Sequence, residues 1–124
     1  MIQSFRDLDV YNRSYRLSLE MYCRTAELPE HERYNLASQI RRAAVSIPLN
    51  IAEGYGRKQS EAEFRHFLRN AMGSCNEVSV LVDMLKDLGY IDEDKHSLLS
   101  NEYDILGRML NKLIQSWRTL DSNL

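Results

Sequence analysis

The chain has 124 residues, of which 16 are Lys or Arg and 18 are Asp or Glu, and its formal net charge is −2 at pH 7. This length is typical of one domain, residues 1–124, which can bury a hydrophobic core without disulfides or a metal. The N-terminus has no basic segment followed by an apolar run, and no apolar stretch approaches the ~20 residues that span a bilayer. A membrane-spanning class is therefore excluded, and a cytoplasmic protein is expected.

The first helix is predicted from about Asp7 or Asp9 to Ala26. Its apolar residues form two adjacent sets, and we expect both to face the bundle. One set is Leu8, Tyr15, Leu19 and Tyr22, and the other is Val10, Leu17 and Met21. Cys23, in this helix, and Cys75 form no Cys-x-x-Cys pair, so both are interpreted as small apolar residues.

The second helix is predicted to start at Leu28-Pro29-Glu30, because proline and acidic residues suit a first helical turn. Its inward residues recur at helical spacing until Gly54 and Gly56 close it. They are Leu36, Ile40, Ala43, Ile47 and Ile51. Pro48 lies inside this pattern and removes one backbone hydrogen bond, at a cost of ~3 kcal/mol, so we expect a kink there. A split into two helices at Ser46 is the alternative.

The third helix is predicted to begin at Ser60-Glu-Ala-Glu63, which has the spacing of a capping box, and to stop at Gly89. Its apolar residues step alternately by four and three. They are Phe64, Leu68, Ala71, Cys75, Val78, Val82 and Leu85. The fourth helix repeats this step after residues 90–94, with Leu99, Tyr103, Leu106, Leu110, Leu113, Trp117 and Leu120. Four helices with short connections predict an all-α, antiparallel, up-down-up-down four-helix bundle.

Three segments carry a resemblance to a known family. They are Gln39–Gly56 (QIRRAAVSIPLNIAEGYG), Gly73–Glu77 (GSCNE) and Leu88–Ile91 (LGYI). Over residues 5–117 the chain resembles the four-helix-bundle family of bacterial proteins first noticed inside intervening sequences of large-subunit ribosomal RNA genes. The resemblance implies the same fold. One related branch, the accessory variability proteins of diversity-generating retroelements, forms a homopentamer that binds nucleic acid and a reverse transcriptase, so a pentamer is the leading expectation.

The two C-terminal helices carry more apolar residues than one seam requires. The additional residues are Phe67, Leu81 and Leu88 in the third helix, and Ile105, Met109 and Ile114 in the fourth. Broad apolar faces are uncommon on monomers, so a second buried face, and hence self-association, is predicted. The alternative is one wide core.

A polar series follows one face of the second helix at spacings of four, four and three: Arg42, Ser46, Asn50 and Glu53. The third helix carries Asn70, Ser74 and Glu77 at similar spacing. An antiparallel pair would place Ser74 and Glu77 opposite Ser46 and Asn50. We interpret the series as an internal hydrogen-bond network that fixes helix register, and a ligand or nucleic-acid site is the alternative.

The sequence contains no set of residues that is expected to form a catalytic or metal site. Glu63-Phe-Arg-His66 and Glu93-Asp-Lys-His96 match the Glu-x-x-His strings of di-iron bundles. The two strings begin neighbouring antiparallel helices, so they lie at opposite ends of the bundle. A helix of ~28 residues is roughly 40 Å long, and this separation excludes one shared metal pair. There is no Gly-rich phosphate loop and no strand pattern for a nucleophile elbow. The sequence predicts no enzyme, no metal and no cofactor.

Charge is distributed unevenly along the chain. Residues 41–69 carry six Arg or Lys against three Glu, whereas residues 70–124 carry five against nine acidic residues. Arg57, Lys58, Arg65 and Arg69 are predicted to form a basic patch that binds RNA or DNA phosphates. The retroelement relatives use a markedly basic surface, and this acidic chain departs from them, so its affinity should be weak and salt-sensitive unless the patch is concentrated. The alternative function is a scaffold that binds a protein partner.

Overall fold

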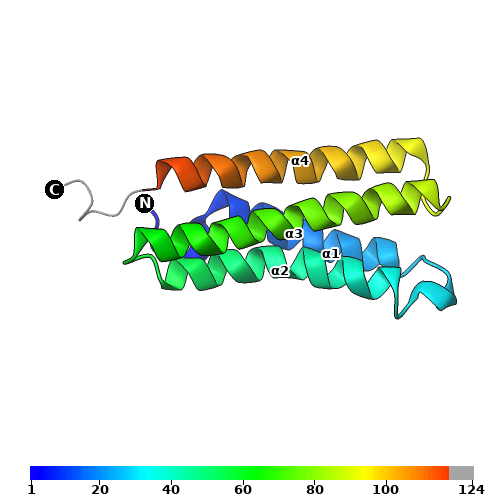
Figure 1. Ribbon diagram of the computed structural model, residues 1–124, viewed down its shortest axis with the longest axis horizontal. Helices are drawn as coiled ribbons and strands as arrows, with labels where there is room; N and C mark the ends of the chain where they lie inside the picture. The colour runs from blue at the N-terminus through cyan, green and yellow to red at the C-terminus, as the bar shows by residue number, and fades with distance from the viewer. Residues whose placement is uncertain (118–124) are drawn as a thin grey trace.

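The computed structural model describes residues 1–117, and the predicted contact of Leu120 lies outside them. Four long helices, α1 (Asp9–Thr25), α2 (Leu36–Gly56), α3 (Glu61–Asp87) and α4 (Glu93–Ser116), follow one another with two short 3₁₀ turns, η1 (Phe5–Asp7) and η2 (Glu30–Glu32). Figure 1 shows the helices lying side by side along one axis. The predicted all-α four-helix bundle is confirmed.

Contacts between neighbouring helices give their relative directions. Along α2 and α3, Ser46 meets Ser74 and Arg57 meets Glu63. Along α3 and α4, the Arg65 side chain reaches the Ile114 carbonyl. Ser46 and Ser74 lie midway along their helices, whereas Arg57 follows the end of α2 and Glu63 lies near the start of α3. Arg65, near the start of α3, likewise meets Ile114 near the end of α4, as in antiparallel packing (Figure 1). The α2 helix packs along both α1 and α3, and α3 packs along both α2 and α4, whereas α1 and α4 touch at far fewer points.

The core is continuous along the bundle axis. Its fully buried large side chains come from all four helices: Leu17, Met21, Ile40, Ile47, Ile51, Phe64, Leu68, Leu85, Leu99, Tyr103, Leu106 and Leu110. Cys75 is buried in this core, and the burial raises the pKa of its thiol to about 11, as expected for a small apolar residue. At one end, Phe64 and Trp117 pack edge to face with their ring centroids 4.7 Å apart.

Of the two predicted apolar sets of the first helix, only the second is buried throughout, and Leu8 is the one buried member of the first. Val10, Leu17 and Met21 are at most 4 % exposed, whereas Leu19 and Tyr22 are 52 % and 46 % exposed. Each residue turns a helix by about 100°, so Leu19 projects about 200° away from Leu17. Both residues therefore cannot face the same core. The expectation that Tyr15, Leu19 and Tyr22 point into the bundle was wrong.

Helix ends differ from expectation mainly before α2. Pro29 and Glu30 begin the η2 turn rather than the helix, and α2 starts at Leu36. The helix then continues through Pro48 to Gly56 without splitting at Ser46, and the kink at Pro48 stays a prediction. Gly89, with φ of 83°, follows the end of α3, as the sequence indicates.

Candidate nucleic-acid interface

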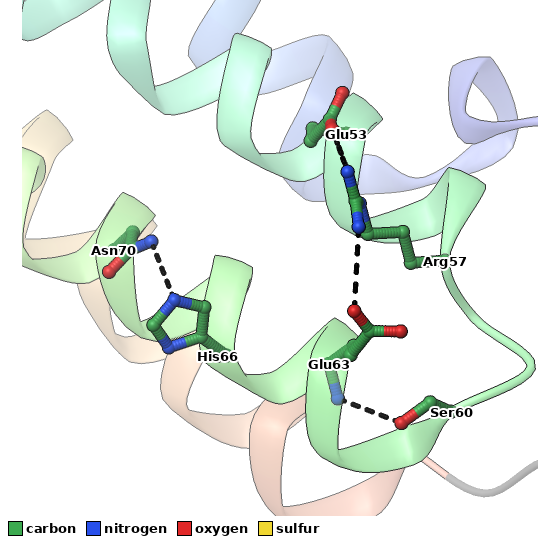
Figure 2. A network of polar contacts seen from close by, with 6 residues as sticks. All are labelled: Glu53, Arg57, Ser60, Glu63, His66 and Asn70. Carbon is green, nitrogen blue, oxygen red and sulfur yellow. Dashed lines mark hydrogen bonds and ion pairs between the residues drawn. The ribbon is translucent and has the colours of Figure 1, made fainter.

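Arg57, the first member of the predicted basic patch, is neutralised by two carboxylates. Its Nη2 lies 3.0 Å from Glu53 Oε1 and its Nη1 lies 3.4 Å from Glu63 Oε1. Figure 2 shows the guanidinium between these two glutamates, close to the place where Ser60 caps α3. The hydrogen bond to Glu53 is the main cause that raises the pKa of Arg57. Because Glu63 turns to Arg57, Ser60 supplies a cap without the reciprocal bond of a capping box.

The side chain of Arg65 donates hydrogen bonds to the C-terminal end of α4. Its Nε donates to the Ile114 carbonyl at 3.0 Å and its Nη2 donates to the Trp117 carbonyl at 2.7 Å. These carbonyls belong to the last turn of the helix and to its C-terminal cap, where backbone acceptors lack partners and the helix dipole attracts cations. The guanidinium of Arg65 is therefore engaged in holding two helices together.

The four residues of the predicted patch do not converge. Glu63, which binds Arg57, and Arg65, which reaches α4, are two residues apart, so they leave α3 in directions about 200° apart. The Lys58 ammonium lies 4.1 Å from the centroid of the Tyr55 ring. Arg69 is exposed one turn after Arg65 and forms no hydrogen bond or ion pair with residues 1–117. Charge is thus divided between two flanks of α3.

The polar series of the second helix also divides. The hydroxyls of Ser46 and Ser74 form a hydrogen bond between α2 and α3, and Asn50 Nδ2 donates to the Ser46 carbonyl at 2.8 Å. Glu53 binds Arg57 instead of this group, and Glu77 is exposed. Asn70 lies one turn from His66, 3.5 Å from its ring (Figure 2). Arg42 and Ser46 also line a groove that was not predicted from the sequence.

This groove lies at the opposite end of α2 from the predicted patch and has a volume of about 530 Å³. The end of α1, the segment that follows η2 and the first part of α2 form it. We call it the arginine groove, after the arginines that line it together with two tyrosines: Arg33, Arg41, Arg42, Tyr22 and Tyr34. Ser38, Val45, Ser46 and Leu49 complete the lining, and no carboxylate is among these residues.

A signal for the arginine groove is present in the sequence. No Asp or Glu occurs between Glu32 and Glu53, a span that includes most of α2. The charge count over residues 41–69 begins inside this acid-free run and omits Arg33, and Arg42 is assigned to the polar series. The run leaves Arg41 and Arg42 without neighbouring carboxylates in α2, and Arg33 at its start lines the same groove.

The three arginines of the groove differ in how firmly they are held. Arg41 Nε donates to Thr25 Oγ1 at 2.8 Å, and its Nη2 donates to the Tyr22 carbonyl at 3.2 Å. Arg33 makes an exposed 3.5 Å contact with Glu30. Arg42 is exposed and has no hydrogen bond or ion pair within the described part of the chain. Arg41 is therefore a structural anchor, whereas Arg33 and Arg42 have donors available for a ligand.

Chemically, the groove offers guanidinium groups and aromatic rings to an anionic ligand. Guanidinium groups bind phosphates in bidentate fashion, and arginines with nearby aromatic rings are typical of nucleic-acid surfaces. Among residues 1–117, no three His, Cys, Asp or Glu side chains gather in a way that would hold a metal ion. No helix within the same residues is long and apolar enough to cross a membrane.

Comparison with known proteins gives one family. Residues 6–112 match the family model described as 23S rRNA-intervening sequence protein. None of the curated proteins matches the chain.

A solved structure shares the fold. It is the crystal structure of a Bacteroides thetaiotaomicron protein, described as a protein of unknown function from the S23 ribosomal protein family. The two chains are 23 % identical and superpose with a TM-score of 0.78, covering 86 % of this chain and 96 % of the other. At this identity, the likeness supports the four-helix bundle and nothing more specific.

Proposed function

Because this chain belongs to the family of 23S rRNA-intervening sequence proteins, we propose that it is a non-enzymatic protein that binds RNA or DNA phosphates through the arginine groove. The observation that carries the proposal is the convergence of Arg33, Arg41 and Arg42 on a groove without a lining carboxylate. The family description connects these proteins with ribosomal RNA genes, which is consistent with a nucleic-acid ligand.

A net charge of −2 argues against strong binding of nucleic acid, but positive charge is concentrated locally in the groove. Electrostatic attraction between exposed charges is screened beyond about 8 Å at physiological salt, so a phosphate in the groove responds mainly to nearby groups. Glu53 and Glu63, which face Arg57, do not line the groove. A strand bound there would contact arginines while the acidic α4 lies outside the contact.

Self-association is part of the proposal, with a pentamer as the leading expectation. The additional apolar residues of α3 and α4 give it mixed support, because Leu81 and Ile114 are at most 8 % exposed and belong to the core, whereas Leu88 is 54 % exposed. Further support comes from α1, where Tyr15 and Leu19 are about half exposed and neighbour each other on one face. Light scattering measures the subunit number directly.

The same exposed face of α1 favours the second candidate function, a scaffold that holds a protein partner. Tyr15 and Leu19 present aromatic and aliphatic surface at a place that does not line the groove. This function requires no nucleic acid, and it predicts that changes in the arginine groove leave partner binding intact.

The decisive experiment compares two exposed arginines, Arg42 in the groove and Arg69 in the patch predicted from sequence. Fluorescence anisotropy of labelled RNA and DNA oligonucleotides is measured from 50 to 200 mM salt for the unaltered protein, Arg42→Glu and Arg69→Glu. Each lost phosphate contact reduces the slope of log K against log salt by about 0.7 to 0.9. We expect Arg42→Glu to lower both affinity and slope, and Arg69→Glu to change neither.

The pair is well matched, because both arginines are exposed on helices and lack partners within residues 1–117. Both changes alter the net charge by the same amount. Loss of binding in Arg69→Glu alone would show that nucleic acid binds on α3 and would refute binding in the arginine groove. Absence of binding by the unaltered protein at 50 mM salt would refute nucleic-acid binding and leave the scaffold.

A further inference from the structure

Tyr34 is unusually exposed for a large aromatic residue. It is 84 % exposed, beside a groove whose other tyrosine, Tyr22, is 46 % exposed. Most of the Tyr34 ring surface therefore faces water in the isolated molecule, although tyrosine is usually at least half buried in a folded protein. Structural stability does not account for this placement, because the ring does not contribute to the core.

Both tyrosines of the groove are accompanied by an arginine. The guanidinium carbon of Arg33 lies 5.4 Å from the centroid of the Tyr34 ring, and that of Arg41 lies 4.8 Å from the centroid of Tyr22. An arginine at this distance is attracted to the π-electrons of the ring. The exposed ring of Tyr34 thus lies beside a positive charge.

We propose that the arginine groove binds unpaired nucleotides of a single strand, with one base stacked on Tyr34 and the adjoining phosphates on Arg33 and Arg42. This inference rests on the proposed function and adds the class of nucleic acid. Stacking on aromatic side chains combined with phosphate contacts is the mode by which proteins bind single strands without reading sequence. The volume of about 530 Å³ is within the range of ~300–1,000 Å³ that holds small molecules.

A duplex does not offer the same contacts. Its bases are stacked on one another inside the helix, and a protein without an element that enters a groove meets mainly phosphates. Phosphate contacts alone leave the exposed ring of Tyr34 unused. The combination of the exposed Tyr34 ring with the unpaired guanidinium of Arg42 therefore favours a strand whose bases can turn outward.

The test uses four proteins: the unaltered chain, Tyr34→Ala, Tyr34→Phe and Leu98→Ala. Leu98, 50 % exposed on α4, is the control, because it is a large exposed side chain that neither lines the groove nor belongs to the exposed face of α1. The probes are a fluorescein-labelled 12-nucleotide single-stranded RNA of mixed sequence, the same strand as DNA, and the RNA duplex. A second single strand carries 2-aminopurine, whose fluorescence is quenched by stacking.

We expect the unaltered protein to bind the single strand more tightly than the duplex and to change the 2-aminopurine fluorescence. Tyr34→Ala should weaken single-strand binding about tenfold and abolish the fluorescence change, because one base–aromatic stack is worth ~1–3 kcal/mol. Tyr34→Phe keeps the ring and should bind as the unaltered protein does, and so should Leu98→Ala. The DNA arm decides whether the 2′-hydroxyl contributes.

Two results separate the failure of this inference from that of the proposed function. Equal affinity for single strand and duplex, with both unaffected by Tyr34→Ala, would overturn stacking while phosphate binding stands. No binding to any probe at 50 mM salt would overturn both. Because Tyr34 is exposed, its replacement should leave the fold intact, and circular dichroism of each variant verifies this.

Discussion

Gly54 lies buried in the last turns of α2, against α3. A Cβ at this position would stand 2.7 Å from Phe67 Cβ and 3.0 Å from Phe64 Cδ1. Real Cβ atoms do not approach so closely, and the Cβ of Phe67 cannot move without its helix. The sequence indicates only that Gly54 marks a helix end. In the structure, this glycine also permits the close approach of α2 and α3.

We predict that Gly54→Ala lowers the free energy of unfolding by about 1 to 3 kcal/mol, the usual cost of overpacking. Gly56→Ala is the matched control, because a Cβ at residue 56 would meet nothing within 4 Å and the φ of this glycine is not positive. The control should leave stability unchanged or raise it by up to about 1 kcal/mol. Urea unfolding measures both, and equal effects at the two glycines would contradict the steric account.

At the scale of helices, two arginines perform the same task at two helix ends. Arg41 of α2 donates to the Tyr22 carbonyl in the last turn of α1, and Arg65 of α3 donates to carbonyls at the end of α4. Each supplies donors to carbonyls near a helix end from a neighbouring helix, although the Tyr22 carbonyl also accepts from the backbone N–H of Ala26 at 3.2 Å. The α1–α2 and α3–α4 pairs are thus each joined by a charged hydrogen bond in addition to the apolar core.

We predict that Arg65→Met lowers the free energy of unfolding by about 1 to 3 kcal/mol, because it removes charged hydrogen bonds to two backbone carbonyls. The change should also shift the emission of Trp117, the only tryptophan, to longer wavelength as the end of α4 loosens from Phe64. Arg69→Met, one turn away and exposed, should alter stability by less than about 0.5 kcal/mol. Unchanged fluorescence and stability in Arg65→Met would show that the cap is unimportant.

The sequence predicts the helices well and the surfaces poorly, for physical reasons. Stepped apolar residues in α3 and α4 determine their inward faces, since only one stripe of each helix meets the core. In α1, two apolar sets compete, and only packing decides that Leu17 is buried and Leu19 is exposed. The arginine groove combines side chains from residues 22 to 49, and such convergence follows from tertiary structure rather than from spacing.

On the scale of the whole molecule, the four helices are not equivalent. The α2 and α3 helices each pack along two neighbours, whereas α1 and α4 each have one extensive neighbour and a sparse seam with each other. The Arg13–Glu102 ion pair, at 3.0 Å, is one of the bonds that cross this seam. Both side chains are 28 % exposed, so the pair adds little stability.

We therefore predict that amide hydrogens in α2 and α3 exchange most slowly, and that those of α1 exchange through a partial opening of lower free energy. Native-state hydrogen exchange followed by mass spectrometry resolves the four helices. Uniform protection of α1 and α3 would indicate that the bundle opens only as a unit. In that case the sparse seam has no consequence for dynamics.

The acid-free run between Glu32 and Glu53 also bears on how a ligand would arrive. A polyanion that approaches the part of the molecule after residue 69 meets a net negative charge, because nine of the 14 charged residues there are acidic. The arginine groove has no lining carboxylate and attracts it, so encounters should be oriented before contact. Such a protein would occupy isolated positions on a strand rather than coat it, since the acidic sides of adjacent copies would repel each other.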